Sequence, residues 1–153
     1  MESYHIFKRA EAYSLDRFVV AQERMYGRAL AEVRNGKKLT HWIWYIFPQL
    51  RGLGSSNNSL YYGIESECEA RAYLQHSVLG SRLKEITAVL LNLNVANIKE
   101  VFGELDAMKV CSCMTLFREV AEDDLFEKVI NRYFHGVADD KTLKLLGKLN
   151  MDV

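Results

Sequence analysis

Apolar residues recur every three or four positions along almost the whole chain, a spacing typical of amphipathic α-helices. The longest such stripe runs from Leu15 to Val33, between Ser14, which can cap a helix start, and Gly36, which can end one. One position of the stripe is polar, because Gln22 stands where the spacing calls for an apolar side chain. Sustained alternation of apolar and polar residues, the mark of a half-buried strand, does not occur. The pattern predicts an all-α protein.

Shorter helices are predicted further along the chain. A helix from residue 40 or 41 should end near Phe47, because Pro48 disfavours the helical conformation in the residue before it. Gln49–Ser59 is rich in glycine, serine and asparagine and is expected to be a loop. The other expected helix starts are Ser66, Ser77, Asn97, Asp106, Asp123 or Asp124, and Asp139 or Asp140. We expect a single compact domain of about seven helices over residues 14–153, without significant sheet, after an N-terminal extension over residues 1–13.

The charge balance bears on possible partners. Lys plus Arg number 20 and Asp plus Glu number 20, so the formal net charge is zero. A protein that binds duplex nucleic acid usually shows a basic face, and the totals give no such signature. The hydrophobic content of 49% is that of a folded domain with a core.

The location of the protein is predicted from three features. The N-terminus lacks the apolar segment of a secretory signal. The longest apolar run, Trp42–Phe47, is far shorter than the roughly 20 residues of a membrane span. Three cysteines are an odd number, and Cys111 and Cys113 lie about 200° apart on a helix, so they suit neither a disulfide nor a shared metal site. We expect reduced cysteines, a cytoplasmic protein and no membrane partner.

A candidate ligand site lies in the segment HWIWYIFPQLRGLG, residues 41–54, which holds both tryptophans and the single proline. Cationic groups beside aromatic rings suit flat or anionic ligands, since they pair with phosphate or carboxylate while indoles stack on bases. Ile43, Ile46 and Phe47 are expected to anchor the segment inward. The residues expected at the pocket are His41, Trp42, Trp44, Gln49 and Arg51, with Lys38 at the rim. The alternative is a solvated basic turn beside a pair of core tryptophans.

Other candidate ligand-binding residues lie outside this segment. Gln22 can read the edge of a base or ribose, or it can brace a stretch of backbone, because a buried amide must find hydrogen-bond partners. Lys109 and Ser112 lie three residues apart on one predicted helix face, an arrangement that can hold a phosphate and that also occurs on ordinary helix flanks. Met108 is expected on the core face of the same helix. Tyr62 completes the set as a group that orients a sugar or base.

Histidine and cysteine spacings favour no metal and no cofactor. None of the four histidines lies at metal-ligand spacing from another histidine or a cysteine, and no nucleophile elbow is present. His41 remains a candidate general acid or base, because an unperturbed imidazole has a pKa of about 6.5.

Several motifs resemble a family of small bacterial proteins classed as a domain of unknown function. They are LxRFVxAQ at residues 15–22, KLTHWIWYIFPQLRGLG at 38–54, SCMTLF at 112–117 and YFHG at 133–136. The resemblance covers nearly the whole chain and implies a compact, single-domain helical protein, but it brings no catalytic residue with it. Some family members carry the label calpastatin, after an inhibitor that is an extended chain. The apolar content here favours a folded core instead.

A shorter likeness, through Phe18, Ala21 and Gln22, is to the helical NADAR proteins, which are associated with ADP-ribose and N-glycosidic chemistry. The acidic catalytic residue of that family has no match in this chain. The leading hypothesis is therefore a pocket for a nucleotide or ADP-ribose-like ligand, with N-glycosidic hydrolysis as a further activity. The alternative is a protein-interaction module that uses the tryptophan-rich segment as its contact surface.

Overall fold

The computed structural model describes residues 14–149 and is all-helical in that range, which confirms the predicted fold class. The predicted N-terminal extension, residues 1–13, lies outside the described residues, as do residues 150–153. A single isolated parallel bridge, between Leu50 and Ile64, is the only β-pairing in the described part of the chain. The helices are α2 (Asp16–Arg34), α3 (Ile43–Ile46), α4 (Asn57–Tyr62), α5 (Glu67–Gln75), α6 (Leu79–Leu91), α7 (Lys99–Arg118), α8 (Leu125–Tyr133) and α9 (Asp140–Leu145).

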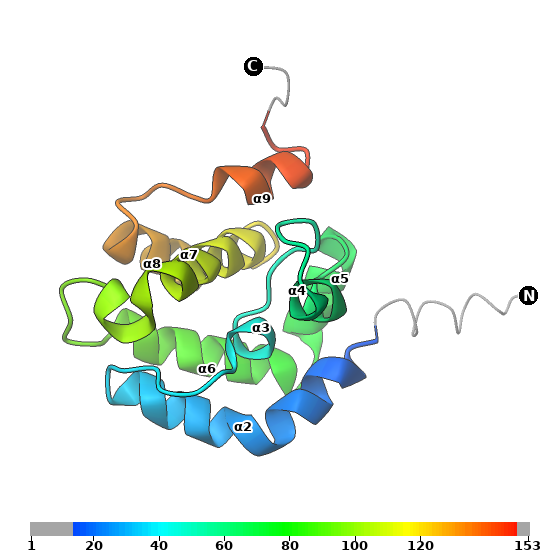
Figure 1. Cartoon of the computed structure of the whole chain (residues 1–153). Helices are drawn as coiled ribbons and strands as arrows, with labels where there is room; N and C mark the ends of the chain where they lie inside the picture. The colour runs from blue at the N-terminus through cyan, green and yellow to red at the C-terminus, as the bar shows by residue number, and fades with distance from the viewer. Residues whose placement is uncertain (1–13, 150–153) are drawn as a thin grey trace, which may run out of the picture.

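The helices are arranged in layers (Figure 1). Helices α2 and α6 pack against each other at the base of the view, and α8 packs on both α6 and α7. The short helix α3 lies in the middle and contacts α2 and α4. Helix α9 lies above α7 and contacts it. This arrangement brings α7 and α9 close to α3 and α4, from which they are far apart in the sequence.

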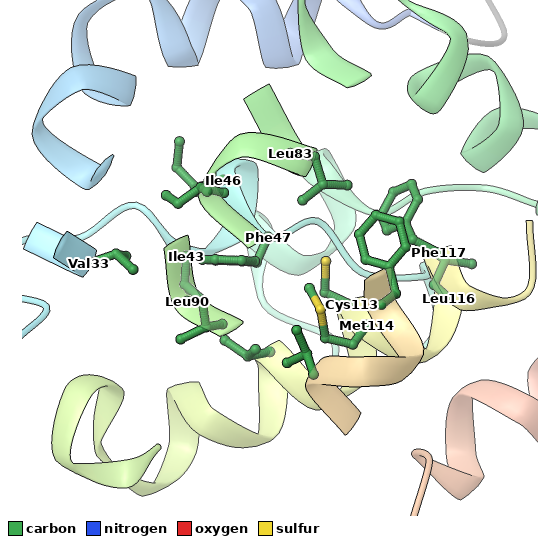
Figure 2. Packing of buried hydrophobic residues seen from close by; sticks show 14 of the residues in the cluster. Val33, Ile43, Ile46, Phe47, Leu83, Leu90, Cys113, Met114, Leu116 and Phe117 are labelled. Atoms are coloured by element: carbon green, nitrogen blue, oxygen red, sulfur yellow. The ribbon is translucent and has the colours of Figure 1, made fainter. Parts of the chain in front are cut away.

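The core is formed where α3, α6 and α7 meet (Figure 2). Ile43, Ile46 and Phe47 are buried, which confirms that this segment anchors inward. Figure 2 shows them in one cluster of buried side chains with Cys113, Met114 and Phe117 of α7. Burying such large side chains contributes about 1.5–3 kcal/mol each to folding, so this contact holds the centre of the fold.

Helix starts agree with the sequence in part. Ser66 Oγ accepts the Glu69 N–H at 3.3 Å, and Asp139 Oδ2 accepts the Thr142 N–H at 3.0 Å, as expected. The predicted loop, however, already contains the start of α4, where Ser56 Oγ accepts the Ser59 N–H at 3.1 Å. The serines and asparagines there cap a helix, and their composition alone resembles a loop.

Other starts differ from the prediction, among them Asp106, which lies inside α7 and pairs with Lys38 and Lys109. Helix α2 begins without a side-chain cap, so Ser14 does not have the predicted role. At α6 the first free N–H groups, those of Val78 and Leu79, donate to His76 Nδ1, each at 3.2 Å, and not to Ser77. The imidazole nitrogen thus supplies the acceptor that a serine was expected to supply.

Gly80 sets how closely α6 approaches the end of α5. A Cβ at residue 80 would lie 2.0 Å from the Leu74 carbonyl oxygen, so any side chain forces the two helices apart.

We expect Gly80→Ala to lower the free energy of unfolding by about 2–3 kcal/mol. Gly27 is the matched control, because a Cβ there meets nothing within 4 Å in the exposed middle of α2. Gly27→Ala should raise the free energy of unfolding by about 0.5–1 kcal/mol. Urea unfolding followed by circular dichroism measures both, and equal effects would contradict the packing described.

Candidate functional site

A buried carboxylate at the end of α2 holds the tryptophan-rich segment. Glu32 Oε1 accepts the Leu39 N–H at 2.8 Å, the Thr40 N–H at 3.1 Å and the Trp42 indole N–H at 2.9 Å, while its Oε2 accepts the Thr40 hydroxyl at 2.8 Å. Burial by itself raises the pKa of Glu32, but these donors outweigh it and lower the pKa to about 2. The carboxylate is therefore ionised at neutral pH.

Trp42 is consequently a core residue. Its side chain is 1% exposed and packs edge-on against Phe102, with the ring of Phe47 also in contact distance. Because its indole N–H is already bound to Glu32, Trp42 offers neither a face nor a donor to a ligand. The prediction that Trp42 lines the pocket is not met by its position.

Gln22 is also committed to the protein. Its Nε2 donates to the Tyr45 carbonyl at 2.8 Å and to the Tyr73 hydroxyl at 3.0 Å, and its Oε1 accepts from Arg82 at 3.3 Å. The side chain is 1% exposed. Of the two roles open to this amide, the structure places it in the bracing one, tying α2 to α3, α5 and α6.

A third polar group of α2, Arg17, was not singled out from the sequence. Its guanidinium donates to the Tyr61 carbonyl at 2.8 Å, to the Gly63 carbonyl at 2.9 Å and to Glu69 Oε2 at 3.0 Å. These bonds hold the junction of α4 and α5 and so fix one wall of the site. Sequence spacing gave no signal for this, since Arg17 lies on the polar flank of its helix.

A cavity of about 300 Å³ opens between α3, the α3–α4 loop, α4, α7 and the start of α9. It brings together Trp44, Gln49, Tyr62, Lys109 and Ser112, all of them predicted site residues. Leu50, Leu53, Gly54, Ser59, Gly63, Leu105, Met108, Asp139 and Lys141 complete the lining. The cavity is thus mainly apolar, with a few polar groups from separate segments, as small-molecule sites are.

Gln49 lies in the wall with an unpartnered amide. Its backbone is fixed, because its carbonyl accepts the Ile64 N–H at 2.8 Å, and the Ile64 carbonyl accepts the Arg51 N–H at the same distance. The residue is 7% exposed, and its Nε2 has no hydrogen-bond partner among the described residues. A buried donor without a partner costs about 1–3 kcal/mol, and such groups are rare unless something else pairs with them.

Trp44 and Lys109 form the cationic side of the cavity. The Lys109 ammonium lies 4.8 Å from the centroid of the Trp44 ring and 3.1 Å from Asp106 Oδ1. The Lys38 ammonium lies 2.9 Å from Asp106 Oδ2. Burial disfavours ionisation of Asp106, but the two ammonium groups together lower the pKa of this carboxyl below its ordinary value. Asp106 therefore remains charged between two lysines.

Two hydroxyls add hydrogen-bonding capacity. Burial, and to a lesser degree Tyr61, raises the pKa of Tyr62, so its hydroxyl stays protonated and able to donate. Ser112 donates to the Met108 carbonyl at 3.2 Å, which leaves its oxygen as an acceptor.

Besides Gln22 and Trp42, three more predicted residues lie outside this lining. His41 is exposed and is not part of the wall, which leaves the catalytic prediction without support from its position. Arg51 is exposed and pairs with Glu65 at 2.9 Å, because the bridge to Ile64 places these two side chains together. Lys38 does not line the cavity, and its ammonium lies 5.1 Å from the Trp42 ring centroid.

The sequence missed part of the wall. Met108 was expected in the core, but it is 62% exposed at the cavity rim beside Leu105. The buried face of α7 passes through Ala107, Val110 and Met114, so Met108 is one position out of phase. Asp139 and Lys141 were missed because only the packing of α9 on α7 brings them to the site.

A family model described as "Protein of unknown function (DUF1810)" matches residues 12–146. The chain belongs to this family. It is similar to the crystal structure of the conserved hypothetical protein Rv1873 from Mycobacterium tuberculosis, at 44% identity and a TM-score of 0.87. That match covers 89% of this chain and 98% of the other. No curated protein matches the chain. The resemblance to a small helical family of unknown function is confirmed.

Two further observations concern residues 14–149. No helix in this range combines the length and apolar composition that crossing a membrane requires. No three histidine, cysteine or acidic side chains of the same range come together as a metal site would require.

The anchoring role of Glu32 is testable through pH. Above about pH 4.5, the ordinary pKa of a glutamate, the carboxylate is ionised in both folded and unfolded chains, so its stabilising effect is complete. As the pH falls from there toward 2, the unfolded chain takes up the proton first and the stabilisation is lost. We expect Glu32→Gln to lower the free energy of unfolding by about 2–3 kcal/mol at pH 7.

The difference between wild type and Glu32→Gln should shrink steadily as urea unfolding is repeated from pH 5 down to about pH 2. Because both proteins contain the same other carboxylates, comparing them at each pH cancels the contribution of those groups to the pH dependence of stability. A difference that stays constant over this range would show that the Glu32 charge does not anchor the segment.

Proposed function

We propose that this protein binds a nucleotide-class small molecule, one that joins a heteroaromatic base to an anionic group, in the cavity between Trp44, Gln49 and Lys109. The observation that carries the proposal is the buried, unpartnered amide of Gln49 in the cavity wall. A primary amide presents a donor and an acceptor side by side, which matches the edge of a nucleobase. The rigid backbone at Gln49 keeps this group in place before a ligand arrives.

The remaining lining supports the same class of ligand. Leu50, Leu53 and the ring of Tyr62 offer apolar contact to a flat ring. Lys109 and Lys141 bring two cations to the cavity, against the single carboxylate of Asp139. An anionic group is thus favoured at the lysine side.

The cavity size limits the ligand. A volume of about 300 Å³ is at the lower end of the roughly 300–1,000 Å³ typical of small-molecule sites. It suits a mononucleotide better than a whole dinucleotide. For an ADP-ribose-like ligand, one half would lie inside and the other would extend over the exposed rim at Leu105 and Met108.

N-glycosidic hydrolysis is the narrower part of the proposal. Asp139 is the carboxylate of the lining, and its Oδ2 already accepts both the N–H and the hydroxyl of Thr142. Binding therefore has more support than turnover. Release of free base or ribose from a bound ligand, measured by chromatography, would establish the hydrolase.

The protein-interaction alternative has less support than ligand binding. It requires a tryptophan on a flat or protruding surface, whereas Trp42 is buried and Trp44 lines the cavity.

The binding proposal is tested by a thermal-shift screen with adenosine, AMP, ADP-ribose and NAD, followed by calorimetry. A ligand that binds the folded chain adds about 2.7 kcal/mol to the free energy of unfolding at one hundred times its Kd. It therefore raises the melting temperature. We expect AMP, ADP-ribose and NAD to give larger shifts than adenosine, because adenosine lacks the anionic group. No shift with any of the four at millimolar concentration would overturn the proposal.

Gln49→Met separates binding from folding. Removing the unpartnered amide should raise the free energy of unfolding by about 1 kcal/mol, because methionine fills the space without a buried donor. The same change should weaken ligand binding by at least about tenfold. The matched control is Gln75→Met on α5, where the side chain is exposed and both quantities should stay unchanged. A Gln49→Met protein that is less stable than wild type would indicate that the amide serves the fold.

A further inference from the structure

A single carboxylate, Asp106, lies between two lysines, of which Lys109 lines the cavity. The Lys38 ammonium is 2.9 Å from Oδ2, and the Lys109 ammonium is 3.1 Å from Oδ1. Two positive charges face one negative charge, so the group as a whole carries one positive charge. The question is which lysine presents that charge.

The surroundings of the two lysines differ. The side chain of Lys38 is 9% exposed, its ammonium lies over the Trp42 ring, and its backbone N–H donates to the Val101 carbonyl at 2.8 Å. The side chain of Lys109 is 28% exposed and lines the cavity. Lys38 is therefore held in place against Asp106, while Lys109 can turn toward the cavity.

We infer that Lys109 forms an anion subsite of the cavity and that Lys38, which does not line the cavity, is a positioning residue that keeps Lys109 available by neutralising Asp106. The inference rests on the proposed function and deepens it, since it assigns the anionic end of the ligand to one side of the cavity. Without Lys38, Asp106 would pair with Lys109 alone, and the pair would be neutral.

The inference also orients the ligand. Because the Lys109 ammonium lies over the Trp44 ring, this face of the indole is covered, and the base has to lie toward Gln49 and Tyr62. The phosphate then lies at Lys109, near the oxygen of Ser112 and on the same side as the exposed rim. A mononucleotide with one phosphate group fits this orientation, with its base toward Gln49 and its phosphate at Lys109.

A purely structural role for Lys38 is the alternative, since its ion pair also joins the segment before α3 to α7. The two roles differ in how a double substitution behaves. Lys38→Met should neutralise the subsite, whereas Lys38→Met with Asp106→Asn leaves Lys109 unpaired and restores its charge. If the role of Lys38 is purely structural, the double variant should not recover the property that the single variant loses.

The first measurement needs no nucleotide. Quenching of tryptophan fluorescence by iodide, compared with neutral acrylamide, reports the local charge at Trp44, because Trp42 is buried. We expect Lys38→Met to reduce iodide quenching about twofold, the double variant to recover it, and acrylamide quenching to stay constant. Lys99→Met is the control, since that lysine is exposed, pairs with Glu104 and does not line the cavity. Equal iodide quenching in all variants, or no recovery in the double variant, would overturn the inference.

The second measurement is calorimetry with AMP and adenosine. We expect Lys38→Met to weaken AMP binding about tenfold, to leave adenosine binding unchanged, and to be rescued by Asp106→Asn. An equal loss for AMP and adenosine would overturn the inference and leave the proposed binding in place. If iodide quenching follows the expected pattern and AMP and adenosine do not bind, the anion subsite stands and the nucleotide proposal fails.

Discussion

The buried carboxylate of Glu32 is the interaction on which the site depends. It holds two backbone N–H groups, a hydroxyl and an indole within the turn that follows α2. A charge is costly to bury unless its hydrogen bonds are complete, and here four donors meet it. Because Trp42 is bound to Glu32, the direction of α3 is fixed, and with it the side from which Trp44 faces the cavity.

The same principle is repeated along α2. Gln22 binds the carbonyl of Tyr45 on α3, and Arg17 binds the carbonyls of Tyr61 and Gly63 at the end of α4. Each of these polar groups captures backbone that would otherwise lack partners in a fold of short helices and loops. Helix α2 thus shapes the cavity without lining it, while α7 and α9 supply the charged groups. The residues that shape the cavity and the residues that line it are therefore different sets.

The fold was predictable because helical spacing and capping residues are local signals, as Ser66 and Asp139 illustrate. Helix α4 was missed because a six-residue helix rich in serine and asparagine is stabilised by its packing and not by its composition. The tryptophan pair shows the limit for the site. Trp42 precedes α3 and has non-helical backbone angles, so helical spacing does not decide which indole faces inward. Which one does so is decided by Glu32, ten positions earlier, and no spacing rule contains that contact.

Gln22 and Gln49 show why the role of a polar residue in apolar surroundings cannot be assigned from the sequence alone. From the sequence, both are amides beside buried positions, and both suit a ligand equally well. In the fold, Gln22 has a partner for its donor and its acceptor, so a ligand would have to compete with the protein. Gln49 has a fixed backbone and an unpartnered amide nitrogen within the described residues. Such a group lowers the stability of the fold, and it lies in a wall shared with Lys109 and Tyr62. This unmet hydrogen bond is what separates Gln49 from Gln22, and it is the reason why the binding proposal rests on Gln49.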